Sequence, residues 1–68
     1  MLKNPDTATG LNNLALLYQD QGQYKLAKPL FQRALSILEQ ALGPEHPNTQ
    51  MGRRNYEGLL REMGRGEG

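Results

Sequence analysis

Residues 11–34, LNNLALLYQDQGQYKLAKPLFQRA, decide the fold of this chain. Apolar residues recur there twice at the spacing of an α-helix. The first set is Leu11, Leu14, Ala15 and Tyr18, and the second is Tyr24, Ala27, Phe31 and Ala34. Gly22 lies between the two sets and interrupts the period. Each alanine stands where a large side chain would hold two helices apart, so the stretch predicts a helical hairpin with closely packed arms.

Capping residues and helix breakers mark the ends of the predicted helices. Asn4 is a candidate N-cap, and Pro5 suits the first position of a helix. The second helix is expected to continue through Pro29, because the apolar period passes that residue unbroken, and to end before Gly43. Pro47 suits the start of a third helix. The predicted helices span about residues 5–21, 24–42 and 47–63, and residues 64–68 are expected to be a frayed tail.

The chain repeats itself with a shift of 42 residues. Six of the eighteen positions from Pro5 to Gly22 are identical to the positions 42 residues later. The pairs are Pro5 and Pro47, Thr7 and Thr49, Gly10 and Gly52, Asn13 and Asn55, Leu17 and Leu59, and Gly22 and Gly64. The chain therefore holds one full hairpin followed by the first helix of the next one.

Length and composition limit the function classes. A chain of 68 residues forms one small domain, and a domain of about 60 residues buries only roughly 60% of its unfolded surface. A net charge of +1 gives no reason to expect nucleic-acid binding. The longest apolar run is the five residues 14–18, far short of the about 20 that a membrane span needs. The absence of cysteine and of a signal peptide fits a cytoplasmic protein.

Catalytic and metal-binding patterns are missing from the sequence. His46 is the only histidine and precedes Pro47 in a loop, so we interpret it as a helix cap or a solvated side chain. No nucleophile has a base in a recognisable order. The glycine-rich run 64–68 follows no strand and precedes no helix, which argues against a phosphate-binding loop. We therefore expect no enzyme activity, no catalytic residue, no metal and no cofactor.

The helix pattern resembles that of the tetratricopeptide repeat family. That family uses a large-x-x-Leu-small-x-x-Tyr helix, a glycine before the turn, and a second helix with Ala-x-x-x-aromatic-x-x-Ala. The 42-residue period and the stretches LNNLALLYQDQGQY, AKPLFQRALSI and LGPEHPNT resemble the kinesin light chain-like branch. The resemblance implies an all-α fragment of an α-α superhelix, made of a hairpin and a third capping helix, with a role as a scaffold or adaptor that binds proteins.

The third helix departs from the family pattern at two positions. Leu11 corresponds to Arg53, and Ala15 corresponds to Glu57. In the family these positions pack on a following helix, so charged residues there predict a polar outer face that ends the array. The other edge of the third helix keeps its apolar character and is expected to pack on the hairpin. Its counterparts in the first helix, Gly10 and Leu17, are expected to stay open for a neighbour.

Ligands of the resembled family lie along the concave surface that successive first helices form. By that resemblance the candidate peptide-binding residues are Asn12, Asn13, Leu16, Gln19, Arg54, Asn55 and Arg61, together with Thr9, Met51 and Gly58. An asparagine amide both donates and accepts, so it suits a peptide backbone. Alternatively, these asparagines bond only to neighbouring turns and to solvent.

A competing hypothesis makes the chain a structural module. In that case its open apolar faces would join copies of the chain into a homo-oligomer or a solenoid, without a separate peptide ligand. Exchange of the third helix between copies, through the hinge at 43–47, belongs to the same hypothesis.

Overall fold

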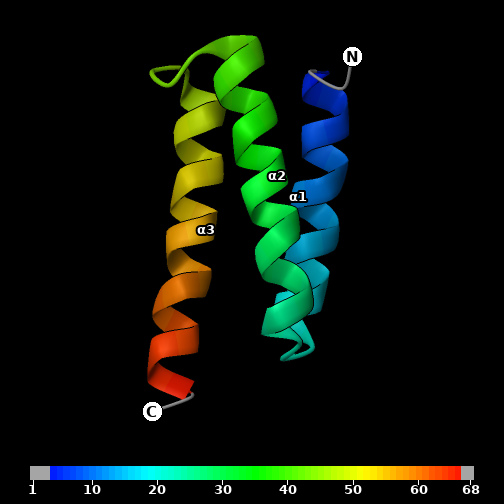
Figure 1. Ribbon diagram of the computed structural model, residues 1–68, viewed down its shortest axis with the longest axis vertical. Helices are drawn as coiled ribbons and strands as arrows, with labels where there is room; N and C mark the ends of the chain where they lie inside the picture. Colours follow the sequence, from blue (N-terminus) through cyan, green and yellow to red (C-terminus); the bar gives the residue numbers. More distant parts are fainter. Residues whose placement is uncertain (1–3, 67–68) are drawn as a thin grey trace.

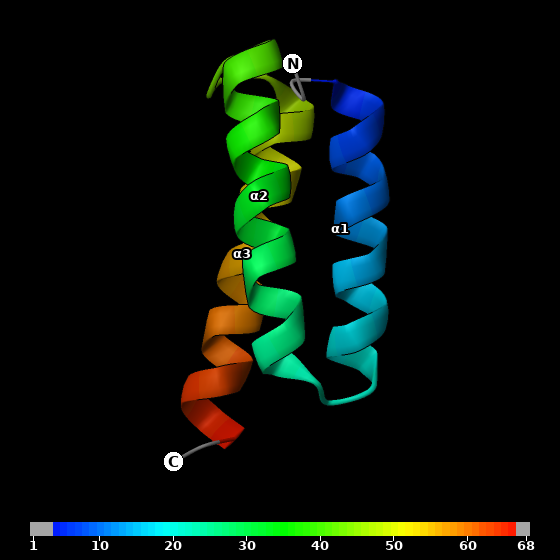
Figure 2. The same cartoon turned by 45° about the vertical axis from the view of Figure 1, so that its right-hand side comes forward.

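The fold is all-α, and α2 lies between the other two helices. Within residues 4–66, the part of the chain that this computed structural model describes, three helices run antiparallel to their neighbours in sequence (Figure 1). They are α1 (Pro5–Asp20), α2 (Tyr24–Leu42) and α3 (Pro47–Gly66). Both α1 and α3 pack on α2 (Figure 2). The result is an elongated body of 35 × 19 × 14 Å.

A closed turn sets the end of α1. The N–H of Gly22 donates to the carbonyl of Gln19 at 3.0 Å, and the N–H of Gln23 donates to that of Tyr18 at 2.8 Å. This pair of bonds is the Schellman motif, which needs a residue at positive φ, and Gly22 has φ 77°. The helix therefore ends at Asp20, one residue before the predicted end at 21, and Gln21 is its C-cap.

The third helix is longer than the sequence predicts. It begins at Pro47 and runs to Gly66, so the predicted end at 63 is wrong, and residues 64–66 of the expected tail are helical. Gly64 does not take the positive φ that Gly22 uses to close α1. A helical glycine costs only about 1 kcal/mol relative to alanine, and Arg65 in the last turn favours the helix. Residues 67–68 lie outside the described part of the chain.

Side-chain caps begin α1 and α3. The Oδ1 of Asn4 accepts from the N–H of Asp6 at 2.8 Å. The Nδ1 of His46 accepts from the N–H of Asn48 at 3.1 Å. The interpretation of His46 as a helix cap is thereby confirmed, and a structural task accounts for the only histidine.

Buried alanines let the helices approach one another closely. One core cluster holds Ala8, Ala34, Ile37 and Leu38, and the other holds Ala15, Ala27, Phe31 and Leu59. Phe31 and Leu59 are fully buried, and Tyr18 and Tyr24 pack at the margin of their cluster. The second cluster draws on all three helices, so Phe31 connects the hairpin to α3.

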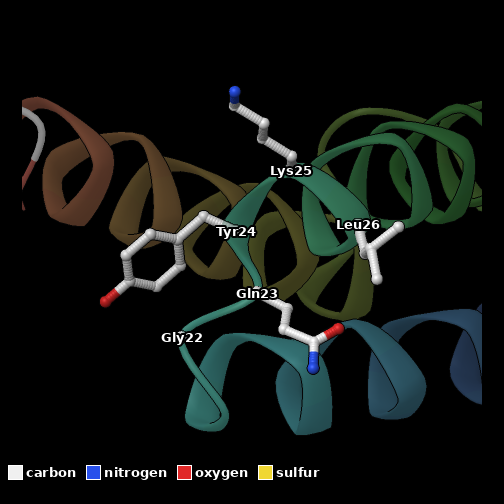
Figure 3. A pocket seen from close by; sticks show the side chains of 5 residues that line it. All are labelled: Gly22, Gln23, Tyr24, Lys25 and Leu26. Atoms are coloured by element: carbon white, nitrogen blue, oxygen red, sulfur yellow. The ribbon is translucent and has the colours of Figure 1, made fainter.

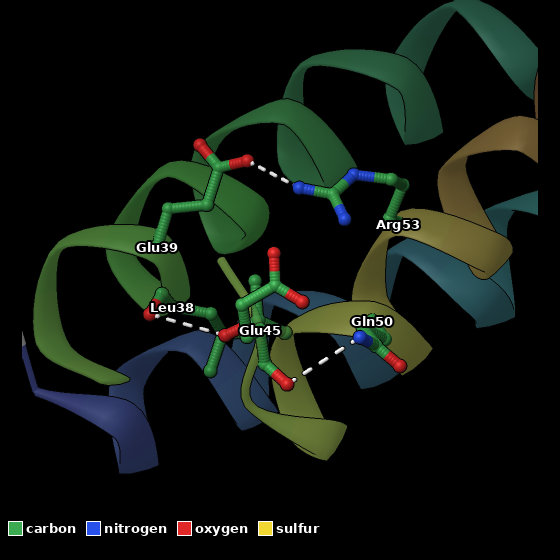
Figure 4. A network of polar contacts seen from close by, with 6 residues as sticks. Leu38, Glu39, Glu45, Gln50 and Arg53 are labelled. Carbon is green, nitrogen blue, oxygen red and sulfur yellow. Dashed lines mark hydrogen bonds and ion pairs between the residues drawn. The ribbon is translucent and has the colours of Figure 1, made fainter. Parts of the chain in front are cut away.

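A buried hydroxyl joins the end of α2 to the start of α3. The Oγ1 of Thr49 donates to the carbonyl of Leu38 at 3.2 Å, and Thr49 is fully buried (Figure 4). Beside it, Arg53 and Glu39 form an ion pair of 2.8 Å, and the amide of Gln50 donates to the carbonyl of Glu45 at 3.4 Å. Arg53 was expected to meet only water, but the structure gives this half-exposed guanidinium a carboxylate on α2.

We expect Thr49→Val to lower the free energy of unfolding by about 1–2 kcal/mol, because it leaves the Leu38 carbonyl without its buried donor. Thr7 is the matched control, since it occupies the same position 42 residues earlier and is exposed. Urea denaturation of both valine variants measures the difference. Equal stability losses for Thr49→Val and Thr7→Val would show that the buried bond contributes nothing.

Candidate functional site

A groove separates α1 from α3 on the side where the two helices border each other across α2. It encloses about 210 Å³. Its lining residues are Ala8, Thr9, Asn12 and Asn13 from α1, Leu38 from α2, and Asn48, Met51 and Gly52 from α3. Apolar groups and three asparagines thus share one concave surface.

Small residues shape this groove. Ala8 is fully buried on α1, and the buried Gly52 lets α3 lie directly on α2. A Cβ added at Gly52 would lie 3.0 Å from the Cδ1 of Leu38. Larger side chains at these two positions would therefore fill the groove or push its walls apart.

The polar groups of the groove are unequally satisfied. Asn12 is half-buried, and its amide oxygen is buried with no hydrogen-bond partner among the described residues. The Oγ1 of Thr9 donates to the carbonyl of Pro5 at 3.1 Å, which commits its proton within α1. Asn13 is exposed. An unsatisfied buried oxygen costs about 1–3 kcal/mol, so Asn12 is poised to take a donor.

Two of the seven candidate binding residues, Asn12 and Asn13, line this groove. Five others do not line it: Leu16, Gln19, Arg54, Asn55 and Arg61. Gln19 shares a feature with Asn12, because its amide oxygen is buried and lacks a partner within residues 4–66. Leu16 is 38% exposed, Asn55 is half-buried, and Arg54 and Arg61 are exposed.

Asn48 is a lining residue that the sequence reasoning missed. It lies three positions before Met51, which the resemblance did place on the concave surface. Residues three apart share a helix face, so extending the pattern by one turn toward the start of the helix would have found it. The backbone N–H of Asn48 is bonded to His46, and its side chain remains exposed.

A second pocket lies at the turn between α1 and α2. It measures about 290 Å³ and is lined by Gly22, Gln23, Tyr24, Lys25 and Leu26. Figure 3 shows the side chains of Tyr24, Lys25 and Leu26 pointing apart, so the pocket gathers no common set of groups. This divergence makes it a poorer candidate site than the α1–α3 groove.

Tyr24 connects this turn to the end of α3. Its hydroxyl donates to the Oε1 of Glu62 at 3.3 Å. Desolvation, and then the negative charge and hydrogen bond of Glu62, raise the pKa of Tyr24 above its ordinary value of 10.0. The phenol therefore keeps its proton at neutral pH and remains a donor to the carboxylate.

Residues 4–66 offer no other obvious chemistry. No group of three or more His, Cys, Asp or Glu side chains within that range could hold a metal ion. The same range contains no helix that is both long enough and apolar enough to cross a bilayer.

The stacked antiparallel helices, two of which begin at prolines 42 residues apart, define the class of α-helical repeat proteins. A family model described as "Tetratricopeptide repeat" matches residues 7–48, which are 42 of the 68 residues. The chain therefore belongs to the tetratricopeptide repeat family, whose repeats serve protein–protein interaction. No solved structure matches the chain.

Proposed function

We propose that the chain is a non-enzymatic adaptor module that binds an extended peptide segment of another protein along the α1–α3 groove. The observation that carries this proposal is the amide oxygen of Asn12, which is buried beside the groove without a donor. A peptide supplies N–H donors along its whole length. When the Asn12 amide turns about its Cβ–Cγ bond toward such a donor, the oxygen gains the hydrogen bond that it lacks.

The two sides of the groove offer complementary chemistry. The α1 side carries the amides of Asn12 and Asn13, which bond to peptide backbone. On α3, Arg54 and Arg61 are exposed and carry guanidinium groups, which pair with carboxylates. A Met51 side chain that is 57% exposed offers apolar contact. The ligand we infer is a peptide with acidic residues and at least one apolar side chain.

The test uses peptides selected from a random displayed library on the parent protein, followed by measurement of their dissociation constants with purified variants. We expect Asn12→Leu to weaken the best peptide at least about tenfold, which corresponds to 1.4 kcal/mol. The same substitution removes an unsatisfied buried oxygen, so we expect the free protein to be as stable as the parent or more stable.

Arg33→Ala is the matched control, because Arg33 is exposed on α2 and lines neither groove nor turn pocket. It should leave the dissociation constant unchanged. If Asn12→Leu weakens folding and binding together, the residue is structural. If affinity survives Asn12→Leu, or the library yields no peptide, the groove is not the binding site.

Self-association is the alternative that the sequence predicts, and it stays a prediction. The face that it would use includes Leu14 and Leu17, which are 40% and 52% exposed. Light scattering over a range of concentrations, on the parent and on Leu17→Glu, distinguishes a monomer from an oligomer built through that face.

We further propose that the chain belongs to the kinesin light chain-like branch and acts in the cytoplasm. The 42-residue period supports the first part, since α1 and α3 begin at Pro5 and Pro47. The absence of cysteine supports the second.

A further inference from the structure

One side of α1 remains uncovered. Thr7, Gly10, Leu14 and Leu17, here termed the outer stripe, follow one another at intervals of three and four residues, so they share one face of the helix. All four are exposed. Leu17 is 52% exposed, and a Cβ added at Gly10 would meet nothing within 4 Å. The outer stripe is therefore an apolar face with an open notch at its glycine.

The same stripe recurs on α3, where it is covered. The counterparts of Thr7, Gly10 and Leu17 are Thr49, Gly52 and Leu59. All three are buried, and Thr49 and Leu59 have no exposed surface. Identical residue types at identical spacing thus have opposite environments, because α3 has a helix packed against its stripe and α1 has none.

The covering helix of α3 is α2, and its contacts are specific. The Cδ1 of Leu38 and the Cδ1 of Leu35 lie 3.0 and 3.9 Å from the Cβ position at Gly52. The carbonyl of Leu38 accepts from the hydroxyl of Thr49, and the hydroxyl of Tyr24 donates to Glu62 near the other end. A leucine pair over a glycine, with a tyrosine eleven residues before it, fixes the register of this contact.

We propose that the outer stripe of α1 binds, antiparallel, an amphipathic helix with the chemistry of α2. Two leucines spaced three residues apart cover Gly10, and the carbonyl of the second accepts from the hydroxyl of Thr7. A tyrosine eleven residues before the first leucine reaches Asp20, which is exposed and is the counterpart of Glu62. Leu14 stands where α3 has Tyr56, so the bond that Gln32 donates to Tyr56 at 2.8 Å has no counterpart.

The occupant is a helix outside the described residues rather than the α2 of a second copy. The leucine face of α2 is already covered by α3, since Leu38 and Leu35 contact Gly52. A second copy would have to release its own α3, and thereby expose Leu59, before its α2 could reach the outer stripe. Two outer stripes facing each other would set one glycine notch against the other, with no side chain to fill either.

The probe is a synthetic peptide with the sequence of residues 24–42, added to the labelled full chain and followed by NMR. We expect saturable shifts of the backbone signals of Thr7, Gly10, Leu14 and Leu17. Gly10→Val fills the notch, and Leu17→Glu places a charge at the contact, so each should raise the dissociation constant at least about tenfold. A peptide with Leu35→Ala and Leu38→Ala should bind correspondingly weakly.

Leu26→Glu is the control, because Leu26 is 51% exposed on α2 and lies outside the outer stripe. It should leave the affinity unchanged. Shifts that centre on Asn13 and Met51, affinity that survives Gly10→Val, or no binding at millimolar peptide would each overturn the proposal. So would a dimer of the parent chain that Leu17→Glu dissolves without peptide. None of these results bears on peptide binding in the α1–α3 groove, which Asn12→Leu tests separately.

Discussion

Phe31→Ala should unfold most of the protein at physiological temperature. Phe31 is fully buried in the cluster that joins α1, α2 and α3. Truncation of a buried phenylalanine to alanine costs about 3–5 kcal/mol, because apolar area is lost and a cavity remains. At about 0.05–0.15 kcal/mol per residue, a chain of 68 residues has a total stability of roughly 3–10 kcal/mol. The substitution therefore removes a large share of the whole.

Circular dichroism at 222 nm during heating measures this loss. We expect the transition midpoint of Phe31→Ala to fall by about 15 °C or more, since 1 kcal/mol shifts the midpoint of a 60–100-residue domain by roughly 4–8 °C. Leu26→Ala is the control on the same helix, because Leu26 is 51% exposed. Similar melting of the two variants would mean that Phe31 is not the centre of the core.

The second large effect concerns a single glycine on α3. Gly52→Val should destabilise the protein by about 1–3 kcal/mol, the usual cost of an overpacked core. The added Cβ would lie 3.0 Å from the Cδ1 of Leu38, closer than normal contact. A valine is branched at Cβ and rigid at χ1, so it cannot turn its methyl groups out of the contact. Either Leu38 changes rotamer or α3 moves away from α2.

Gly10→Val provides the matched control, since it is the same substitution at the same position of the repeat. Nothing lies within 4 Å of a Cβ at Gly10, and valine has a higher helix propensity than glycine. We therefore expect Gly10→Val to leave the stability of the free protein unchanged or to raise it slightly. Urea denaturation of both variants measures the difference, and a Gly52→Val protein as stable as Gly10→Val would contradict the packing described for α3.

The helical hairpin was predictable from local patterns. Apolar spacing identified α1 and α2, and Gly22 identified the turn because a Schellman closure needs positive φ. The end of α3 was predicted wrongly from the same residue type. Gly64 permits a left-handed turn but does not require one, and its neighbours let the helix continue to Gly66.

The candidate site was predictable in part. Asn12 and Asn13 were placed on the concave surface by resemblance, and both line the groove. Sequence spacing gave no indication that the oxygen of Asn12 is buried without a donor, or that Asn48 completes the lining. Arg53 was expected to be solvated, and its partner Glu39 became visible only when α3 was packed on α2.

The sequence by itself determined the helices, the close approach at the alanines and the 42-residue repeat, because side-chain size and periodicity act within a few residues along the chain. Tertiary structure alone decided which of two equivalent stripes is covered. Thr7, Gly10 and Leu17 match Thr49, Gly52 and Leu59 in type and spacing, yet the first set is open and the second is buried. Burial depends on which helix lies alongside, and α2 can present its leucine pair to only one of the two stripes.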